Sequence, residues 1–242
     1  MNTNLTTVAF ERGRIGRQKM AQKLETESLT RVVAGEAIVD SISVRVRESE
    51  VLAIIGSSGA GKSSFLRLLN RLDEPTEGTV YLDGTEYREF EPEELRRRIG
   101  LIPQESALQP GTVRENVGIS DRIRDEPIDD QLTTTLLKWM DLSGYGDRNV
   151  DDLSGGERQR IAIARTLYVD PEVLLLDEPT AHLDTETEAQ IEELLGELIR
   201  EGDLTCILVT HDTAQAERLA DRVVEFENGR VVDEGTPAEV IG

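Results

Sequence analysis

Lysine is scarce in this chain of 242 residues, with Lys19, Lys23, Lys62 and Lys138 as its only copies. Carboxylates are abundant: 48 Asp and Glu stand against 27 Lys and Arg, for a net charge of −21. A surface this acidic repels phosphate backbones, which argues against passive nucleic-acid binding. Excess carboxylate with little lysine is typical of proteins from salt-saturated cytoplasm, where screening removes the self-repulsion, and an ordinary acidic protein is the alternative.

The chain also lacks a second cysteine and any long apolar run. A single Cys206 excludes an internal disulfide, and its place in an apolar run predicts a core residue rather than a reactive thiol. No stretch approaches the ~20 apolar residues of a membrane-spanning helix, and residues 1–28 lack the apolar centre of a secretory signal. We therefore expect a soluble, intracellular protein whose membrane role would require a partner.

Residues 1–28 are polar and rich in Arg, without a sustained apolar period, and we predict a disordered tail there. Two interpretations stay open: a basic arm that contacts lipid or a partner, and a misassigned start with Met20 as the true first residue. The remainder, 29–242, has the length of one α/β domain. A mainly helical segment at about 105–153 is expected to be inserted in it.

Apolar periodicity predicts several strands. Ile42, Val44 and Val46 alternate with polar residues, which indicates a half-buried antiparallel strand. The unbroken apolar runs at 51–55 and 173–176 indicate strands covered on both faces, and 99–102 and 205–210 are predicted as further strands. Asn228-Gly229 predicts a hairpin turn, and a capping box at Thr236 begins the last helix.

A glycine-rich turn separates the predicted strand at 51–55 from a predicted helix at 63–72. It matches the phosphate-binding loop pattern through Gly56, Ser57, Ser58, Gly59, Ala60, Gly61, Lys62 and Ser63, with Ser64 directly behind. The glycines let backbone N–H groups converge on a β-phosphate, and the helix presents its positive end to the same anion. Lys62 is then expected to reach the β- and γ-phosphates, and the Ser63 hydroxyl to ligate Mg²⁺. Kinases, GTPases, recombinases and transporter motors all share this motif.

Two carboxylates, Asp177 and Glu178, close the buried strand at 173–176. The carboxyl ends of strands are where ligands bind in open α/β sheets. We expect Asp177 to hold the Mg²⁺ shell, and Glu178 to orient or deprotonate the attacking water.

The segment from Leu153 to Arg160, LSGGERQR, resembles the signature sequence of ATP-binding-cassette proteins. Its serine and glycines open a helix and leave N–H groups for an anion. In the family that anion is the γ-phosphate of ATP held by the opposite subunit, which implies a head-to-tail dimer. The resemblance covers 29–242, and the further site residues that it implies are Gln104 at the catalytic metal, the switch histidine His211, and Ser154, Gly155, Gly156, Glu157 and Asp184 around the nucleotide.

The resemblance implies an α/β fold: a P-loop NTPase (RecA-like) core, an N-terminal antiparallel β subdomain and an inserted helical subdomain. Two departures stand out. Val32 and Val33 occupy the region where the family has an aromatic residue that stacks on adenine, and His182 replaces a commoner small residue.

The implied activity is ATP hydrolysis with ATP and Mg²⁺, as the motor of a membrane transporter. The implied partners are a second copy, a transmembrane permease at the inner face of the cell membrane and, for an importer, an extracellular substrate-binding protein. We favour import of a phosphate-type oxyanion, with docking on the permease at residues 110–117. Metal-ion export is one alternative, and a soluble cassette ATPase of translation or DNA repair is another. The short spacing between the two nucleotide motifs leaves no room for the long coiled coils of chromosome-maintenance ATPases.

Overall fold

The computed structural model describes residues 21–181, 183–202 and 204–242. The chain forms two compact units, a sheet unit and a helical unit. The described residues of the sheet unit are 21–101, 172–178 and 204–242. Those of the helical unit are 102–171 and 179–202 without residue 182, so this unit takes in more chain than the predicted insertion at 105–153.

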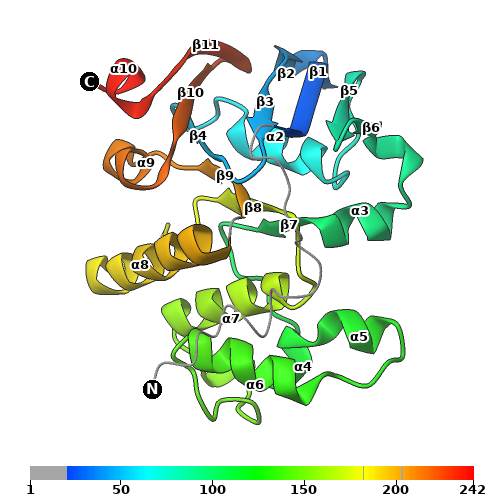
Figure 1. Cartoon of the computed structure of the whole chain (residues 1–242), viewed down its shortest axis with the longest axis vertical. Helices are drawn as coiled ribbons and strands as arrows, with labels where there is room; N and C mark the ends of the chain where they lie inside the picture. The colour runs from blue at the N-terminus through cyan, green and yellow to red at the C-terminus, as the bar shows by residue number, and fades with distance from the viewer. Residues whose placement is uncertain (1–20, 182, 203) are drawn as a thin grey trace. The chain divides into compact units, whose positions relative to one another are not determined.

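A six-stranded sheet in the order β11-β10-β4-β9-β8-β7 forms the centre of the sheet unit (Figure 1). The strands β4 (Val51–Ile55), β9 (Thr205–Val209), β8 (Val173–Asp177) and β10 (Arg222–Glu227) pair in parallel. The edge strand β11 (Arg230–Gly235) returns antiparallel to β10, and β7 (Ile99–Ile102) closes the other edge. Cys206 pairs with Val51 on one side and Leu174 on the other, so β9 has a neighbouring strand along both edges, and all of its residues are buried.

A second, antiparallel sheet has the order β2-β1-β5-β6, with β3 also paired to β1. Its strands are β1 (Gln22–Val33), β2 (Glu36–Ile42), β3 (Arg45–Arg47), β5 (Glu77–Leu82) and β6 (Thr85–Glu86). The predicted alternation is confirmed, because Ile42, Val44 and Val46 are all buried. The chain nevertheless leaves strand geometry between β2 and β3, so the predicted single strand is two.

The prediction of a tail over 1–28 is wrong for its last seven residues. Residues 22–28 form the first half of β1, where Lys23 and Thr26 are buried. Lys23 is paired with Asp83, and the Thr26 hydroxyl donates to the Ile42 carbonyl at 3.1 Å. The question of a start at Met1 or Met20 lies outside the described residues.

The helices of the sheet unit are α2 (Lys62–Leu69), α3 (Pro92–Arg98), α9 (Thr213–Leu219) and α10 (Pro237–Val240), with a 3₁₀ turn at Tyr87–Glu89. The apolar face of α2 packs between residues of both sheets, and Phe65 meets Phe226 edge to face with ring centroids 5.3 Å apart. The predicted hairpin and the capping box at Thr236 are both present. This packing fixes the start of α2 relative to the sheet.

The helical unit contains α4 (Val113–Val117), α5 (Ile119–Ile123), α6 (Asp130–Trp139), α7 (Gly155–Leu167) and α8 (Thr185–Gly202), with a 3₁₀ turn at Val150–Asp152. Helix α7 contacts α4, α6 and α8. Leu136, Leu137 and Met140 are buried, so the apolar side of α6 packs inward. Helix α7 is therefore the centre of this unit.

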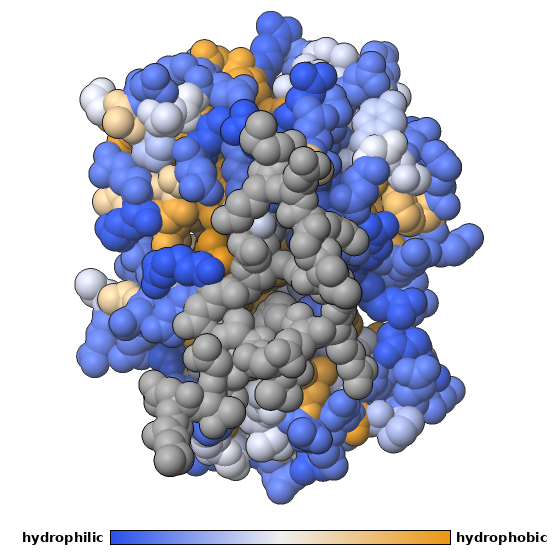
Figure 2. Space-filling view, in the orientation of Figure 1, coloured by the Kyte–Doolittle hydropathy of each residue, from blue (hydrophilic) through white to orange (hydrophobic). Residues whose placement is uncertain are grey.

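On the face drawn in Figure 2 the described residues are mostly hydrophilic, as the net charge of −21 leads one to expect. Among the helices of 21–181, 183–202 and 204–242, none combines the length and the apolar character needed to cross a bilayer.

Candidate nucleotide-binding and hydrolytic site

The glycine-rich turn runs from the end of β4 to the start of α2, as predicted. Gly56 and Gly61 adopt φ of 141° and 96°, conformations that side-chain-bearing residues avoid. A Cβ on Gly56 would lie 2.2 Å from the Phe226 carbonyl oxygen, and one on Gly61 would lie 2.3 Å from that of Ile38. The loop is thus seated directly against the backbones of β10 and β2.

The hairpin between β10 and β11 braces this loop. The Gly229 N–H donates to the Ala60 carbonyl at 3.1 Å, and the Gly229 carbonyl accepts from the Asp40 N–H at 2.8 Å. Asn228 and Gly229 have φ of 48° and 77°, as this kind of tight turn requires. The turn therefore also supports the phosphate-binding loop, a role that its local sequence does not indicate.

Lys62 is curled into the loop that precedes it. Its ammonium donates to the carbonyls of Gly56 and Ser57 at 2.8 and 3.0 Å, and the residue is only 5% exposed. The positive charge is held at the loop, where the sequence predicts the phosphate contact.

The side chains of the two predicted metal ligands Ser63 and Asp177 meet where β8 ends and α2 begins. The Ser63 hydroxyl donates to Asp177 Oδ1 at 2.8 Å. The pKa of the Asp177 carboxyl is raised above its ordinary value. Burial is the largest cause, the Ser63 hydrogen bond opposes it, and the negative charge of Glu178 adds to the rise. A hydroxyl beside a carboxylate is an all-oxygen donor pair of the kind that Mg²⁺ prefers, so the pair fits the predicted metal.

Glu178 stands one residue further, in a constrained conformation. Its φ is 44°, in the left-handed region that is uncommon for a non-glycine residue. Its N–H donates to the Val209 carbonyl at 2.9 Å, and its Oε2 lies 3.3 Å from His211 Nδ1. The two predicted catalytic side chains are thereby adjacent at the carboxyl ends of β8 and β9.

The predicted signature residues begin α7. A capping box joins Ser154 and Glu157: the Ser154 N–H donates to Glu157 Oε2 at 2.7 Å, and the Glu157 N–H donates to Ser154 Oγ at 3.3 Å. The bond from the Ser154 backbone lowers the pKa of the Glu157 carboxyl. Glu157 therefore serves the helix end itself. The N–H groups of Gly155 and Gly156 come before the capped one and have no acceptor within the helix.

Asp184 lies at the start of α8 in the same unit. Its carboxylate accepts from the Thr187 N–H at 3.1 Å and from the Thr187 hydroxyl at 2.7 Å. Gln104 follows β7 and also belongs to the helical unit. His182 lies outside the described residues, and Val32 and Val33 are each 42% exposed on β1.

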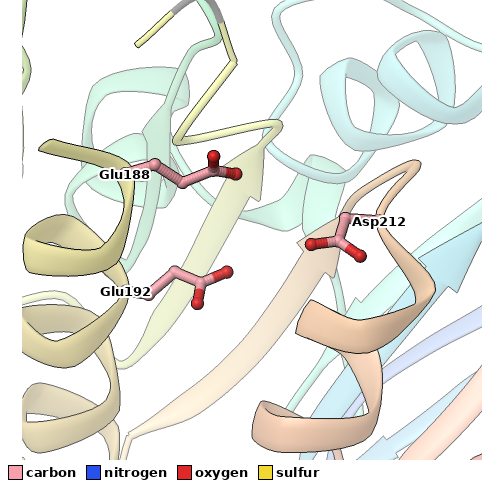
Figure 3. Close-up of side chains that lie close together, drawn as sticks. All are labelled: Glu188, Glu192 and Asp212. Carbon is pink, nitrogen blue, oxygen red and sulfur yellow. The ribbon is translucent and has the colours of Figure 1, made fainter. Parts of the chain in front are cut away.

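Acidic side chains also stand on α8 and at the start of α9 (Figure 3). Glu188 and Glu192 are one turn apart on α8, and Glu188 Oε1 accepts weakly from the Thr180 hydroxyl at 3.5 Å. Asp212 caps α9 by accepting from the Ala214 N–H at 2.9 Å. Glu188 and Asp212 thus each make a hydrogen bond within their own unit.

Sequence reasoning did not foresee two supporting contacts, that of Gly229 with the phosphate-binding loop and that of Thr187 with Asp184. The sheet unit brings together Ser63 with Asp177 and Glu178 with His211. A capping pattern, Asp184 followed three residues later by Thr187, is the one sequence signal that could have identified Thr187.

Comparison with known proteins identifies the class that this fold and site define. The family model described as ABC transporter matches residues 39–181, and the chain therefore belongs to that family. It is an ATP-binding, ATP-hydrolysing subunit of that family. The predicted family and fold class are confirmed.

Two curated relatives show the range of similar proteins. The phosphonates import ATP-binding protein PhnC 1 of Ruegeria sp. is 39% identical over 230 residues, which cover 89% of this chain and 90% of that protein. The methionine import ATP-binding protein MetN 1 of Pseudomonas putida is 39% identical over 217 residues, which cover 86% of this chain and 65% of that protein.

Two solved structures are similar in fold. CbiO1 of Clostridium perfringens, part of the ABC transporter complex cbiONQ, has a TM-score of 0.82 and 30% identity, with 91% of each chain covered. The ATP-binding cassette MJ0796, a dimer in a post-hydrolysis state with ADP and phosphate, has a TM-score of 0.79 and 30% identity, with 88% of this chain and 98% of that one covered.

Proposed function

We propose that two copies of this chain bind two MgATP molecules between them and that hydrolysis of the ATP reopens the pair. The observation that supports this most is the adjacency of Ser63 with Asp177 and of Glu178 with His211 at the carboxyl edge of one parallel sheet. A solved cassette of the same fold is a dimer with ADP and phosphate.

In this proposal each residue has a defined task. The loop at 56–61 and the N-terminus of α2 bind the β-phosphate, and Lys62 contacts the β- and γ-phosphates. Ser63, Asp177 and Gln104 hold Mg²⁺, which neutralises charge on those phosphates. Glu178 accepts a proton from the attacking water, and His211 contacts the γ-phosphate. The start of α7, at Ser154–Gly156, and Asp184 meet the partner's nucleotide.

The expected partners are a permease and, for import, an extracellular binding protein, so the chain would lie peripherally on the inner face of the membrane. CbiO1 is similar in fold and belongs to a transporter complex. We place the permease contact on the segment 110–117, which includes α4. Isolation of the native membrane complex tests this: a copurified permease is the expected result, and copurified ribosomes or DNA would instead favour a soluble cassette ATPase.

For the cargo we favour a phosphate-type oxyanion, because a relative named for phosphonate import is 39% identical over most of its length. A relative named for methionine import is equally identical, and the metal-exporter alternative stays open. Deletion of the gene in its host should abolish uptake of labelled phosphate or phosphonate. Accumulation of intracellular metal would favour export instead, and loss of methionine uptake alone would exclude an oxyanion.

The hydrolytic role is tested by Glu178→Gln, which keeps the shape of the side chain and removes the base. We expect kcat to fall by at least roughly a hundredfold while ATP still binds. Glu197→Gln, at an exposed position on α8, is the matched control and should keep the wild-type rate. If Glu178→Gln hydrolyses ATP as fast as that control, Glu178 is not the base.

A further inference from the structure

The second signature glycine is in contact with α8. A Cβ placed on Gly156 would lie 2.3 Å from the Thr187 methyl carbon, 3.6 Å from Thr187 Cβ and 3.7 Å from its hydroxyl oxygen. The φ of Gly156 lies outside the left-handed region, so the helix itself would accept an alanine here. The Thr187 methyl group alone leaves no room for a side chain at 156.

The other branch of Thr187 points to Asp184, which directly precedes α8. Its hydroxyl donates to Asp184 Oδ2 at 2.7 Å, and its N–H donates to Oδ1 at 3.1 Å, so both carboxylate oxygens are held by one residue. The Thr187 hydroxyl is also the main cause of the lowered pKa of the Asp184 carboxyl. Leu183 lies near the first signature glycine, because its methyl carbon is 3.7 Å from the place where a Cβ on Gly155 would stand.

We infer that Thr187 is a positioning residue that sets the distance between Asp184 and the signature glycines. The inference rests on the proposed function, in which both segments reach the nucleotide of the partner subunit. One threonine binds the Asp184 carboxylate with its hydroxyl and abuts Gly156 with its methyl. Asp184 and the start of α7 then approach the second copy in a fixed arrangement, so neither segment has to become ordered when the two copies pair.

Isosteric variants separate the two branches, because valine keeps the methyl and loses the hydroxyl, and serine does the reverse. In a Glu178→Gln background we expect Thr187→Val to weaken ATP-dependent dimerisation by about tenfold, and Thr187→Ser, which keeps the hydroxyl and loses the methyl contact, to weaken it by about threefold. In the protein with Glu178 unchanged, Thr187→Val should lower kcat for ATP hydrolysis without raising KM for ATP. Thr236→Val removes the capping hydroxyl of α10 and is the control: it should leave pairing unchanged.

A suppression test examines the contact itself. Gly156→Ala should weaken pairing by at least about tenfold, and adding Thr187→Ser should restore it to the level of Thr187→Ser alone. An equally weak double variant would overturn the inference, since Gly156 would then be required by the nucleotide. So would a Thr187→Val protein that pairs normally, since Thr187 would then be a simple helix cap.

The two proposals fail differently. If the Glu178→Gln protein never pairs with ATP, the proposed function is wrong, and the positioning role is overturned with it. If that protein pairs and only the Thr187 predictions fail, the proposed function stands. Melting temperature reports the steric contact independently: Gly156→Ala should melt below wild type, and the added Thr187→Ser should recover the difference.

Discussion

Four charged groups inside the sheet unit allow a quantitative test of the fold. Lys23, only 4% exposed, pairs with Asp83 at 2.9 Å and with Glu172. Arg98 donates to both oxygens of Glu172, at 2.7 and 3.0 Å, and to Asp83 at 2.7 Å. Burial of Glu172 disfavours its charge, but Arg98 and Lys23 outweigh this and lower its pKa to about 2. The perturbation is Glu172→Gln, which removes the charge and keeps the shape.

The magnitude follows from linkage between protonation and folding. A fall from the ordinary 4.5 to about 2 corresponds to an upper bound of about 3–4 kcal/mol, at about 1.4 kcal/mol per pKa unit. The Glu172 side chain is 31% exposed, so solvent screening reduces this to about 1–2 kcal/mol. Because the folded-state pKa is the lower one, this stabilisation is complete above pH 4.5 and is lost as the pH falls towards 2.

Urea unfolding in molar potassium chloride at pH 7, 4 and 2.5 measures this contribution. Net charge also changes over this range, so the readout is the difference between wild type and variant. Wild type should be more stable at pH 7, and the difference should shrink stepwise at pH 4 and 2.5. Glu227→Gln, exposed on β10, should show no such trend. A difference for Glu172→Gln that is zero at pH 7, or independent of pH, would refute this reasoning.

Three further predictions concern the site and the core. Gly61→Ala should lower the free energy of unfolding by roughly 2–4 kcal/mol and weaken ATP binding, because φ is 96° and the Ile38 carbonyl blocks a Cβ; unchanged denaturation and ATP titration would contradict this. His211→Ala should lower kcat by roughly a hundredfold with ATP affinity retained, and an unchanged single-turnover rate would remove His211 from the reaction. Cys206 is fully buried, and burial raises the pKa of its thiol to about 12, so a thiol reagent should label it only on unfolding; rapid labelling of native protein would show the strand to be open.

Local sequence pattern was sufficient to predict those elements whose structure is determined by a single stretch of chain. The continuous apolar runs identified β4, β8 and β9, and Asn228-Gly229 identified the last hairpin. The first half of β1 was missed because its buried positions include Lys23 and Thr26. Their partners, Asp83 and the Ile42 carbonyl, lie 60 and 16 residues away. A polar residue is predicted to lie at the surface unless the distant partner that allows its burial is known.

The same division applies to the site. The phosphate-binding loop and the Asp177-Glu178 pair are each local patterns with a direct chemical reading, so their residues could be predicted. The contacts of Gly229 with Ala60 and of Thr187 with Gly156 arise from folding, which brings distant segments of the chain together. No periodicity or motif encodes such close approaches, except that each leaves a glycine where a Cβ would not fit.

Pairing on ATP is the event on which the proposed mechanism depends. Sedimentation of the Glu178→Gln protein in molar potassium chloride, with and without MgATP, measures it directly. We expect monomers without nucleotide, dimers with MgATP, and two ATP molecules retained per dimer. A protein that binds MgATP and sediments as a monomer at every concentration tested would contradict the ATP-bridged dimer.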